Sequence, residues 1–224
     1  MNKLKIGLLS LIMILLTGCV KVETNFKVNP NNSGDLTLVY ALDKQLANTE
    51  TKNQIETMKN EARDQGYKVS GYSSEKYFGV KIKKHYDNLK NIKAPSGNTD
   101  LFEIDIKEDK RFFKTKYDVK SVFDFEDIIE TEEDENITKE LEDSILSQLD
   151  LTFNLELPVK AGKNNASEIK DNGKNLYWIF IPGIKNYVEV EFTKTNYLNI
   201  TLVFAGVLLI VGFLLFIRKK RKLT

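Results

Sequence analysis

Apolar and polar residues alternate along much of the chain, and the alternation starts at residue 20. Residues 20–28 read VKVETNFKV, with Val, Thr or Phe at every second position, and residues 36–42 resume the same alternation. The segment between them, NPNNSGD, is rich in turn-forming residues. A period of two is typical of a half-buried strand, so residues 20–42 are predicted to form a β-hairpin.

Further stretches with the same period predict a sheet of many strands. A strand that begins at residue 102 is predicted to pair with the next one, RFFKTKYDV at 111–119, through the turn EDK. The segment DNG at 171–173 is a strong hairpin signal. The other predicted strands cover residues 67–73, 77–86, 151–158, 166–170, 175–181 and 186–192.

Two segments have a helical period instead. The first begins at residue 43 or 51 and ends near Gln65, with TKNQ at 51–54 fitting a capping box and Gly66 suited to follow the last turn. Its predicted apolar stripe consists of Ile55, Met58 and Ala62. The second helix follows an acidic run at 126–135, and its apolar residues recur every four positions. They are Ile137, Leu141, Ile145 and Leu149.

The predicted fold class is α+β, with one mostly antiparallel sheet and two amphipathic helices, plus one C-terminal transmembrane helix. The predicted domains are a lipoprotein signal peptide at 1–18, an extracytoplasmic domain at 19–196, the transmembrane helix at 197–217 and a basic cytoplasmic tail at 218–224.

The N-terminal segment is typical of a secretory signal. Lys3 and Lys5 precede an apolar core of 11 residues, which is too short to span a bilayer of about 30 Å. The core ends in LLTGC, which resembles a bacterial lipobox, so the only cysteine, Cys19, is predicted to carry a diacylglyceryl group and fatty acyl chains such as palmitate. An ordinary signal peptide or an uncleaved anchor is the alternative. The residues predicted for signal-peptidase recognition are Leu16, Thr17 and Gly18.

The opposite end has the composition of a membrane span. Residues 198–217 contain no charge over 20 positions, and a basic cluster follows. Basic residues stay in the cytoplasm, so the domain is predicted to lie outside the cell membrane, held close to it at both ends. The topology residues are Arg218, Lys219, Lys220, Arg221 and Lys222.

Charge and residue counts exclude several classes of function. The two ends hold seven of the 33 Lys and Arg and none of the 32 Asp and Glu, so the domain between them carries about −6. This charge argues against a nucleic-acid partner. The counts of one cysteine and one histidine, His85, argue against a metal centre or a Ser-His triad, so we expect no catalytic residues, metal or cofactor.

The order of these features resembles the LppM-like family of bacterial lipoproteins. The matching features are a lipobox cysteine that leads into a strand, the segment DLTLVYAL, and a late stretch with a proline, an asparagine, a glycine and a tryptophan. The resemblance implies an exported, lipid-anchored α+β domain and suggests a lipid- or glycolipid-binding role. The four late residues are Pro158, Asn165, Gly173 and Trp178.

Three classes of function follow. The first is a module that binds or presents envelope lipid in an apolar cavity, with Trp178, Tyr177 and Phe180 as candidate lining residues, although such a strand more often fills the core. The second is a non-enzymatic scaffold that recruits an envelope protein through an exposed apolar patch or sheet edge. The third, a hydrolase with paired carboxylates, is the weakest. The partners expected in all cases are membrane lipids, through Cys19 and the C-terminal helix.

Overall fold

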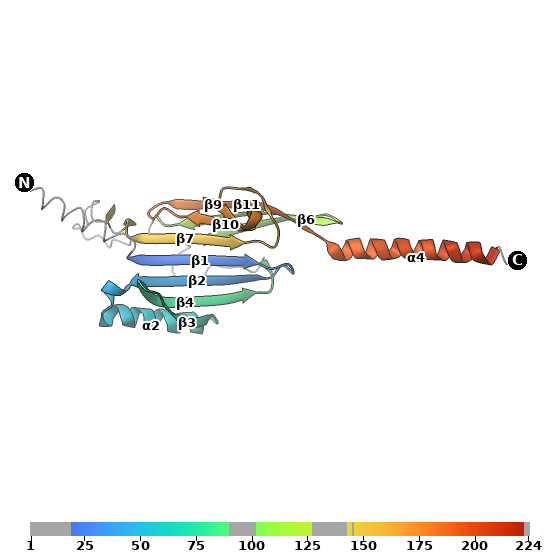
Figure 1. Ribbon diagram of the computed structural model, residues 1–224. Coiled ribbons are helices and arrows are strands. Elements are labelled where there is room, and N and C mark those ends of the chain that lie inside the picture. Colours follow the sequence, from blue (N-terminus) through green and yellow to red (C-terminus); the bar gives the residue numbers. More distant parts are fainter. Residues whose placement is uncertain (1–18, 90–101, 127–142, 145, 222–224) are drawn as a thin grey trace, which may run out of the picture.

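Two β-sheets form the domain, and a long C-terminal helix leaves it at one end (Figure 1). The computed structural model describes residues 19–89, 102–126, 143–144 and 146–221. In spatial order, the larger sheet contains β3 (Lys68–Ser73), β4 (Tyr77–Tyr86), β2 (Gly34–Asp43), β1 (Val20–Val28), β7 (Leu149–Glu156), β10 (Asn175–Ile179) and β9 (Glu168–Lys170). The smaller sheet contains β5 (Phe102–Lys110), β6 (Lys114–Asp124), β11 (Lys185–Thr195) and β8 (Ala161–Asn164).

The prediction of a single sheet is wrong. Three of the predicted strands, now β5, β6 and β11, lie in the smaller sheet, and β1 pairs with β7 in parallel. The local hairpins are confirmed: β1 pairs with β2 from Val20↔Leu42 to Val28↔Gly34, and β9 and β10 flank Asp171–Gly173. A period of two reveals which residues share a face, but it carries no information on which distant strand becomes the neighbour.

The β5–β6 turn lies later than predicted. Antiparallel pairing continues to Lys110↔Thr115, so EDK belongs to β5 and the turn consists of Arg111, Phe112 and Phe113. Arg111 closes the turn by donating its backbone N–H to the carbonyl of Lys114 at 2.8 Å. Two consecutive phenylalanines therefore lie at the end of a hairpin instead of within a strand.

The first predicted helix is confirmed as α2 (Thr49–Asp64), after a short 3-10 turn at Lys44–Leu46. Its N-cap is Asn48, three residues before the predicted position, and Thr51 supplies the reciprocal half of the capping box. Both residue types cap well, so the sequence did not decide between them. Gly66 follows the helix with a φ of +77°, as predicted.

The second predicted helix lies mostly outside the described residues. Ile137 and Leu141 fall in that region, as does most of the acidic run, whereas Leu149 is the first residue of β7. The second predicted helix therefore does not extend to Leu149. Backbone pairing of Val20 with the Gln148 carbonyl at 3.2 Å starts the parallel ladder at this point.

The main core fills the space between the two sheets. It is rich in aromatic rings: Phe123 contacts Phe180 at a centroid distance of 4.6 Å and Phe153 at 5.2 Å, and Tyr117 stacks on Phe192 at 4.8 Å. Aromatic contacts of this kind add about 0.5–1.5 kcal/mol beyond area burial. The stack of rings therefore joins the two sheets.

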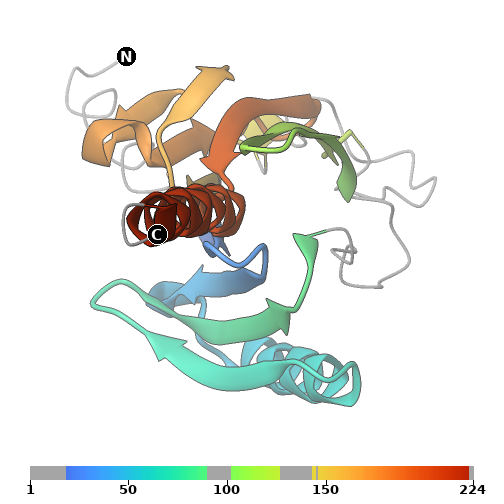
Figure 2. The same cartoon turned by 90° about the vertical axis from the view of Figure 1, so that its right-hand side faces the viewer.

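A second, smaller core lies beneath α2. Ile55 packs with Leu42 and Val80, all of them less than one tenth exposed. Because Val20, Val22 and Phe26 alternate on one face of β1 and contribute to both cores, α2 and the smaller sheet cover the same face of the larger sheet. Figure 2 shows both on one side, α2 over the β3–β4 end and β6 with β11 over the other end. We call this covered face the inner face.

The C-terminal helix, α4 (Tyr197–Arg221), runs away from the domain (Figure 1). Its segment Tyr197–Leu215 has a mean hydropathy of 2.6, and none of it is buried against the domain. By length and composition it suits a membrane span. Arg218 to Arg221 continue the same helix, and Lys222 lies outside the described residues.

Candidate functional site

Cys19 lies at the end of the domain remote from α4. It is half-buried and directly precedes β1, and its carbonyl accepts the backbone N–H of Asp43 at 2.8 Å. The predicted signal-peptidase residues Leu16, Thr17 and Gly18 lie outside the described residues. A group attached to the Cys19 thiol would therefore leave the domain beside the end of β2.

The base of α4 lies at the other end of β1. Lys194, the penultimate residue of β11, donates its Nζ to the Pro30 carbonyl at 2.6 Å and to the side chain of Asn32 in the β1–β2 turn. Asn32 also accepts a hydrogen bond from the Tyr117 hydroxyl at 3.0 Å. Burial lowers the pKa of Lys194 below its usual value, and the charge of Glu108 opposes that shift. These contacts fix the end of β11 against the β1–β2 turn.

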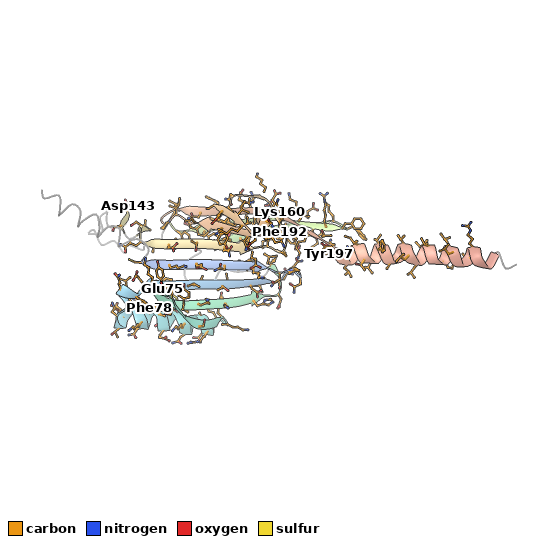
Figure 3. All side chains as sticks on the ribbon, in the orientation of Figure 1. Glu75, Phe78, Asp143, Lys160, Phe192 and Tyr197 are labelled. Carbon is orange, nitrogen blue, oxygen red and sulfur yellow. The ribbon has the colours of Figure 1, made fainter. Side chains whose placement is uncertain are left out.

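The two attachment points are thus separated by the length of the sheet. From the first to the ninth residue of β1 the chain makes eight steps of about 3.3 Å, which separate them by roughly 26 Å. Figure 3 shows the same separation: Phe78, level with Leu42 and Val20, lies near one end of the domain and Tyr197 lies at the other. The sequence indicated closeness to the membrane at both ends, but it did not reveal this distance.

The three candidate lining residues do not share a cavity. Trp178 and Phe180 are 4% and 6% exposed and fill the main core between the sheets. Tyr177, which directly precedes Trp178, points to the opposite face, where the Lys170 Nζ lies 4.4 Å from its ring centroid. The core-filling alternative therefore describes Trp178 and Phe180 better than the ligand-lining one.

Trp178 and Asn165, two of the four residues behind the family resemblance, contact each other directly. The Trp178 Nε1 donates to the Asn165 Oδ1 at 2.9 Å, and the same oxygen accepts the backbone N–H of Glu189 at 2.8 Å. The Asn165 Nδ2 donates to the Tyr187 carbonyl at 2.9 Å. Gly173 is buried with a φ of +86°, a conformation that favours glycine. This motif therefore stabilises the fold, with Asn165 joining β10 to β11.

Between the two cores, the inner face carries a band of half-buried side chains. Thr24, Leu38 and Ile82 lie opposite one another on β1, β2 and β4, and Leu38 belongs to neither core cluster. We call this band the inner strip. It consists of Val22, Thr24, Leu36, Leu38, Tyr40 and Ile82, all of them half-buried. Val22 and Leu36 also pack against the main core, and Tyr40 and Ile82 pack against the core beneath α2. The strip therefore borders both cores and keeps part of its apolar surface exposed.

A hollow of about 620 Å³ lies along α2, and its described lining residues are polar or charged apart from Met58. Met58 is the one lining residue that also packs against the core beneath α2. The described lining consists of Thr49, Glu50, Asn53, Gln54, Thr57, Met58 and Glu61. The polar ends of those side chains suit the head of an amphipathic ligand.

His85 and the start of the acidic run form surface ion pairs. The His85 Nδ1 lies 2.6 Å from Asp35, and both side chains are about half exposed. Glu126, the one described residue of the acidic run, pairs with Lys185 at 3.1 Å. Among the residues described here, no group of three or more His, Cys, Asp or Glu side chains gathers to hold a metal ion.

The β5–β6 turn is a surface that the sequence interpretation missed. Phe112 and Phe113 are 60% and 52% exposed, and their rings meet edge to face at 4.9 Å. A signal was present, because two adjacent phenylalanines cannot both face the same side of a strand. The basic residues Arg111 and Lys114 on either side also pointed to a surface turn.

These features define a class of protein: a two-sheet α+β domain that continues into an apolar helix of membrane-spanning length. A protein-family model described as the LppM domain matches residues 21–194, and the chain belongs to this lipoprotein family. The folded domain of Mycobacterium tuberculosis LppM, solved by NMR, is similar at 13% identity with a TM-score of 0.46. That match covers 80% of this chain and 92% of the other. No curated protein matches the chain.

Proposed function

We propose that this protein is a non-enzymatic, extracytoplasmic domain that binds or presents a membrane lipid or glycolipid on its inner strip. Lipidated Cys19 and the spanning helix α4 hold it at the cell membrane, with the basic end of α4 in the cytoplasm. The observation that carries the proposal is the inner strip itself, an apolar band between two separate cores on one face of the sheet. An acyl chain along the strip would bury side chains that are now half-buried.

Mass spectrometry of the intact full-length protein, released from detergent micelles, tests the lipid role. We expect a reproducible extra mass that denaturation releases as a lipid, and we expect Leu38→Asn to abolish it. Thr37→Asn is the matched control, since Thr37 is also half-buried but points to the opposite face of β2. An extra mass that survives Leu38→Asn would assign the lipid to α4, and a clean protein mass would refute the binding role.

A separate experiment tests the anchors. The variant Cys19→Ala should give an unprocessed, unlipidated chain that still fractionates with membranes through α4. Labelling of intact cells with a membrane-impermeant reagent should modify the domain and leave the basic tail unmodified. If the variant becomes fully soluble, α4 does not span the membrane.

A scaffold that recruits an envelope protein is the second candidate, and exposed isoleucines favour it. Ile179, Ile181 and Ile184 are 72%, 60% and 46% exposed near the end of β10, the neighbour of β9, which is the outermost strand on that side of the described sheet. Apolar side chains grouped on a surface are typical of protein-binding patches. Loss of a captured envelope protein in Ile179→Ser/Ile181→Ser, with the lipid mass unchanged, would support this alternative.

A further inference from the structure

The turn of the β5–β6 hairpin, Arg111–Phe113, exposes two aromatic rings beside the start of α4. We call it the hairpin tip. Phe112 and Phe113 contact each other at 4.9 Å but remain more than half exposed to solvent. Burying a phenylalanine side chain contributes about 1.5–3 kcal/mol, so the pair represents a substantial unused apolar surface.

The hairpin tip is hydrogen-bonded to the first turn of α4. Asn196 donates its backbone N–H to the Phe113 carbonyl at 2.8 Å and its Nδ2 to the Arg111 carbonyl at 3.0 Å. Asn199 donates its Nδ2 to the Phe112 carbonyl at 2.6 Å. The backbone of both phenylalanines therefore lies next to the residue at which the chain enters its apolar helix.

The surroundings of the tip suit a lipid interface. Tyr197, 75% exposed at the base of α4, has the amphipathic ring that is enriched where helices cross the headgroup region (Figure 3). Lys114 and Arg111 flank the two phenylalanines, and Arg111 also pairs with Asp109 at 2.9 Å. Cations at this level are attracted to anionic headgroups by about 1 kcal/mol each.

From this arrangement we infer that the hairpin tip inserts Phe112 and Phe113 into the headgroup region of the leaflet that α4 enters. The inference rests on the proposed function, because it requires α4 to span the membrane. The apolar phase next to the rings is then the membrane itself, and the tip is a third attachment beside Cys19 and α4. It fixes which side of the domain faces the lipid next to α4.

Collision accessibility of a nitroxide label tests the insertion. The chain carries Cys19→Ser, which makes each introduced cysteine the only one, and is reconstituted in nanodiscs of phosphatidylethanolamine and phosphatidylglycerol at 3:1. Phe113→Cys and Phe112→Cys are labelled in turn, which leaves the backbone carbonyls that bind Asn196 and Asn199 in place. Tyr187→Cys is the matched control, because Tyr187 is 59% exposed on the outer side of the smaller sheet.

For each label we take the ratio of its collision rate with oxygen to its collision rate with a water-soluble nickel chelate. This ratio should be at least threefold higher for the two labels on the tip than for the label at Tyr187→Cys. A label at Leu208→Cys in α4 reports the proposed span separately. If the Leu208→Cys label lies in lipid and the tip labels give the same collision ratio as Tyr187→Cys, the inferred insertion of the tip is wrong and the proposed function is unaffected. If the Leu208→Cys label is in water, both fail. Spin–spin broadening that vanishes at one chain per nanodisc would assign the tip to a second copy and overturn the inference.

Discussion

At the residue scale, Asn165 joins two strands through three hydrogen bonds, and one of them satisfies the buried indole of Trp178. The substitution Asn165→Ala leaves that indole N–H without an acceptor at a site that is 4% exposed. An unsatisfied buried donor costs about 1–3 kcal/mol, so we expect a loss of about 2 kcal/mol in the free energy of unfolding.

Urea unfolding of the full chain in detergent measures this loss, with the fluorescence of the only tryptophan as the signal. Lys163→Ala on the adjacent strand β8 is the control, because its side chain is exposed. Equal midpoints for the two variants would show that the Asn165–Trp178 contact does not stabilise the domain.

Asp35 predicts an acid-dependent component of stability. The hydrogen bond from the Asn29 side chain at 2.7 Å, followed by that of His85, holds the pKa of the Asp35 carboxyl below its usual value. A carboxyl whose pKa is lower in the folded state stabilises the fold above its unfolded pKa of about 3.9 and loses that contribution as the pH falls through its folded value. The effect is small because the side chain is about half exposed.

We therefore expect wild type to exceed Asp35→Asn in urea midpoint at about pH 5, with the difference shrinking toward about pH 3. Asp87→Asn serves as control, since its carboxylate is 98% exposed and lies 3.6 Å from the same histidine. A difference that stays constant across this range would contradict the role assigned to Asp35.

The same scale shows which site residues the sequence could identify. Strand alternation alone separates Tyr177 from Trp178 and Phe180, so the sharing of one cavity by all three was already improbable from the pattern. The acceptor of Trp178 was harder to find, because Asn165 reaches it only when β11 and β10 come together across the end of the domain. Contacts that depend on non-local pairing are not encoded in a short window.

At the scale of elements, the N-terminus of α2 tests where the helix begins. Asn48 accepts the Thr51 N–H at 2.8 Å, and Thr51 in turn accepts the Asn48 N–H at 3.0 Å. Removing an N-cap costs about 1 kcal/mol, so Asn48→Ala should lower the free energy of unfolding by about that amount. Chemical denaturation of full-length variants, followed by circular dichroism, measures the change.

Lys52→Ala, an exposed change in the same helical turn, is the matched control. If Asn48→Ala costs no more than Lys52→Ala, the helix begins at Thr51, the later of the two starts that the sequence predicted. Thr51→Ala should be destabilising under either assignment, because Thr51 takes part in both.

The elements that depend on local signals were predicted correctly from the sequence. The way in which the strands assemble into sheets was not. The β1–β2 and β9–β10 hairpins and α2 follow from alternation, turn residues and a helical stripe. The division into two sheets depends on the parallel β1–β7 pair, whose strands are separated by more than half of the chain. The inner strip exists only because α2 and the smaller sheet cover the same face, so it too was hidden from the sequence.

At the scale of the whole molecule, the two predicted anchors and the observed direction of α4 favour different orientations of the domain. The helix continues away from the end of the domain opposite Cys19 (Figure 1). With α4 upright in a bilayer, Cys19 would lie roughly 26 Å or more from the leaflet that the helix enters. Both anchors share that leaflet only if the domain turns about Asn196 and lies along the membrane.

The orientation of the domain depends on the free energies of two sets of contacts. The three hydrogen bonds from Asn196 and Asn199 contribute about 0.5–1.5 kcal/mol each. Two acyl chains gain about 0.8 kcal/mol for every buried CH₂ group, which exceeds those contacts several-fold. Lipidation should therefore reorient the domain so that it lies along the membrane. The hairpin tip stays near the point at which α4 enters the membrane, because the tip borders the hinge residue, Asn196.

Energy transfer from a fluorophore at Lys44→Cys to acceptor-labelled headgroups measures the predicted reorientation. Lys44 is exposed and follows Asp43, which contacts Cys19, so it reports the height of that end. We expect strong transfer in the lipidated chain, whose Cys19 thiol is blocked, and at least a twofold loss in Cys19→Ser. A label at Thr195→Cys, beside the hinge, should give similar transfer in both forms. Equal transfer from Lys44→Cys with and without the lipid would mean that acyl chains on Cys19 do not bring that end of the domain to the membrane.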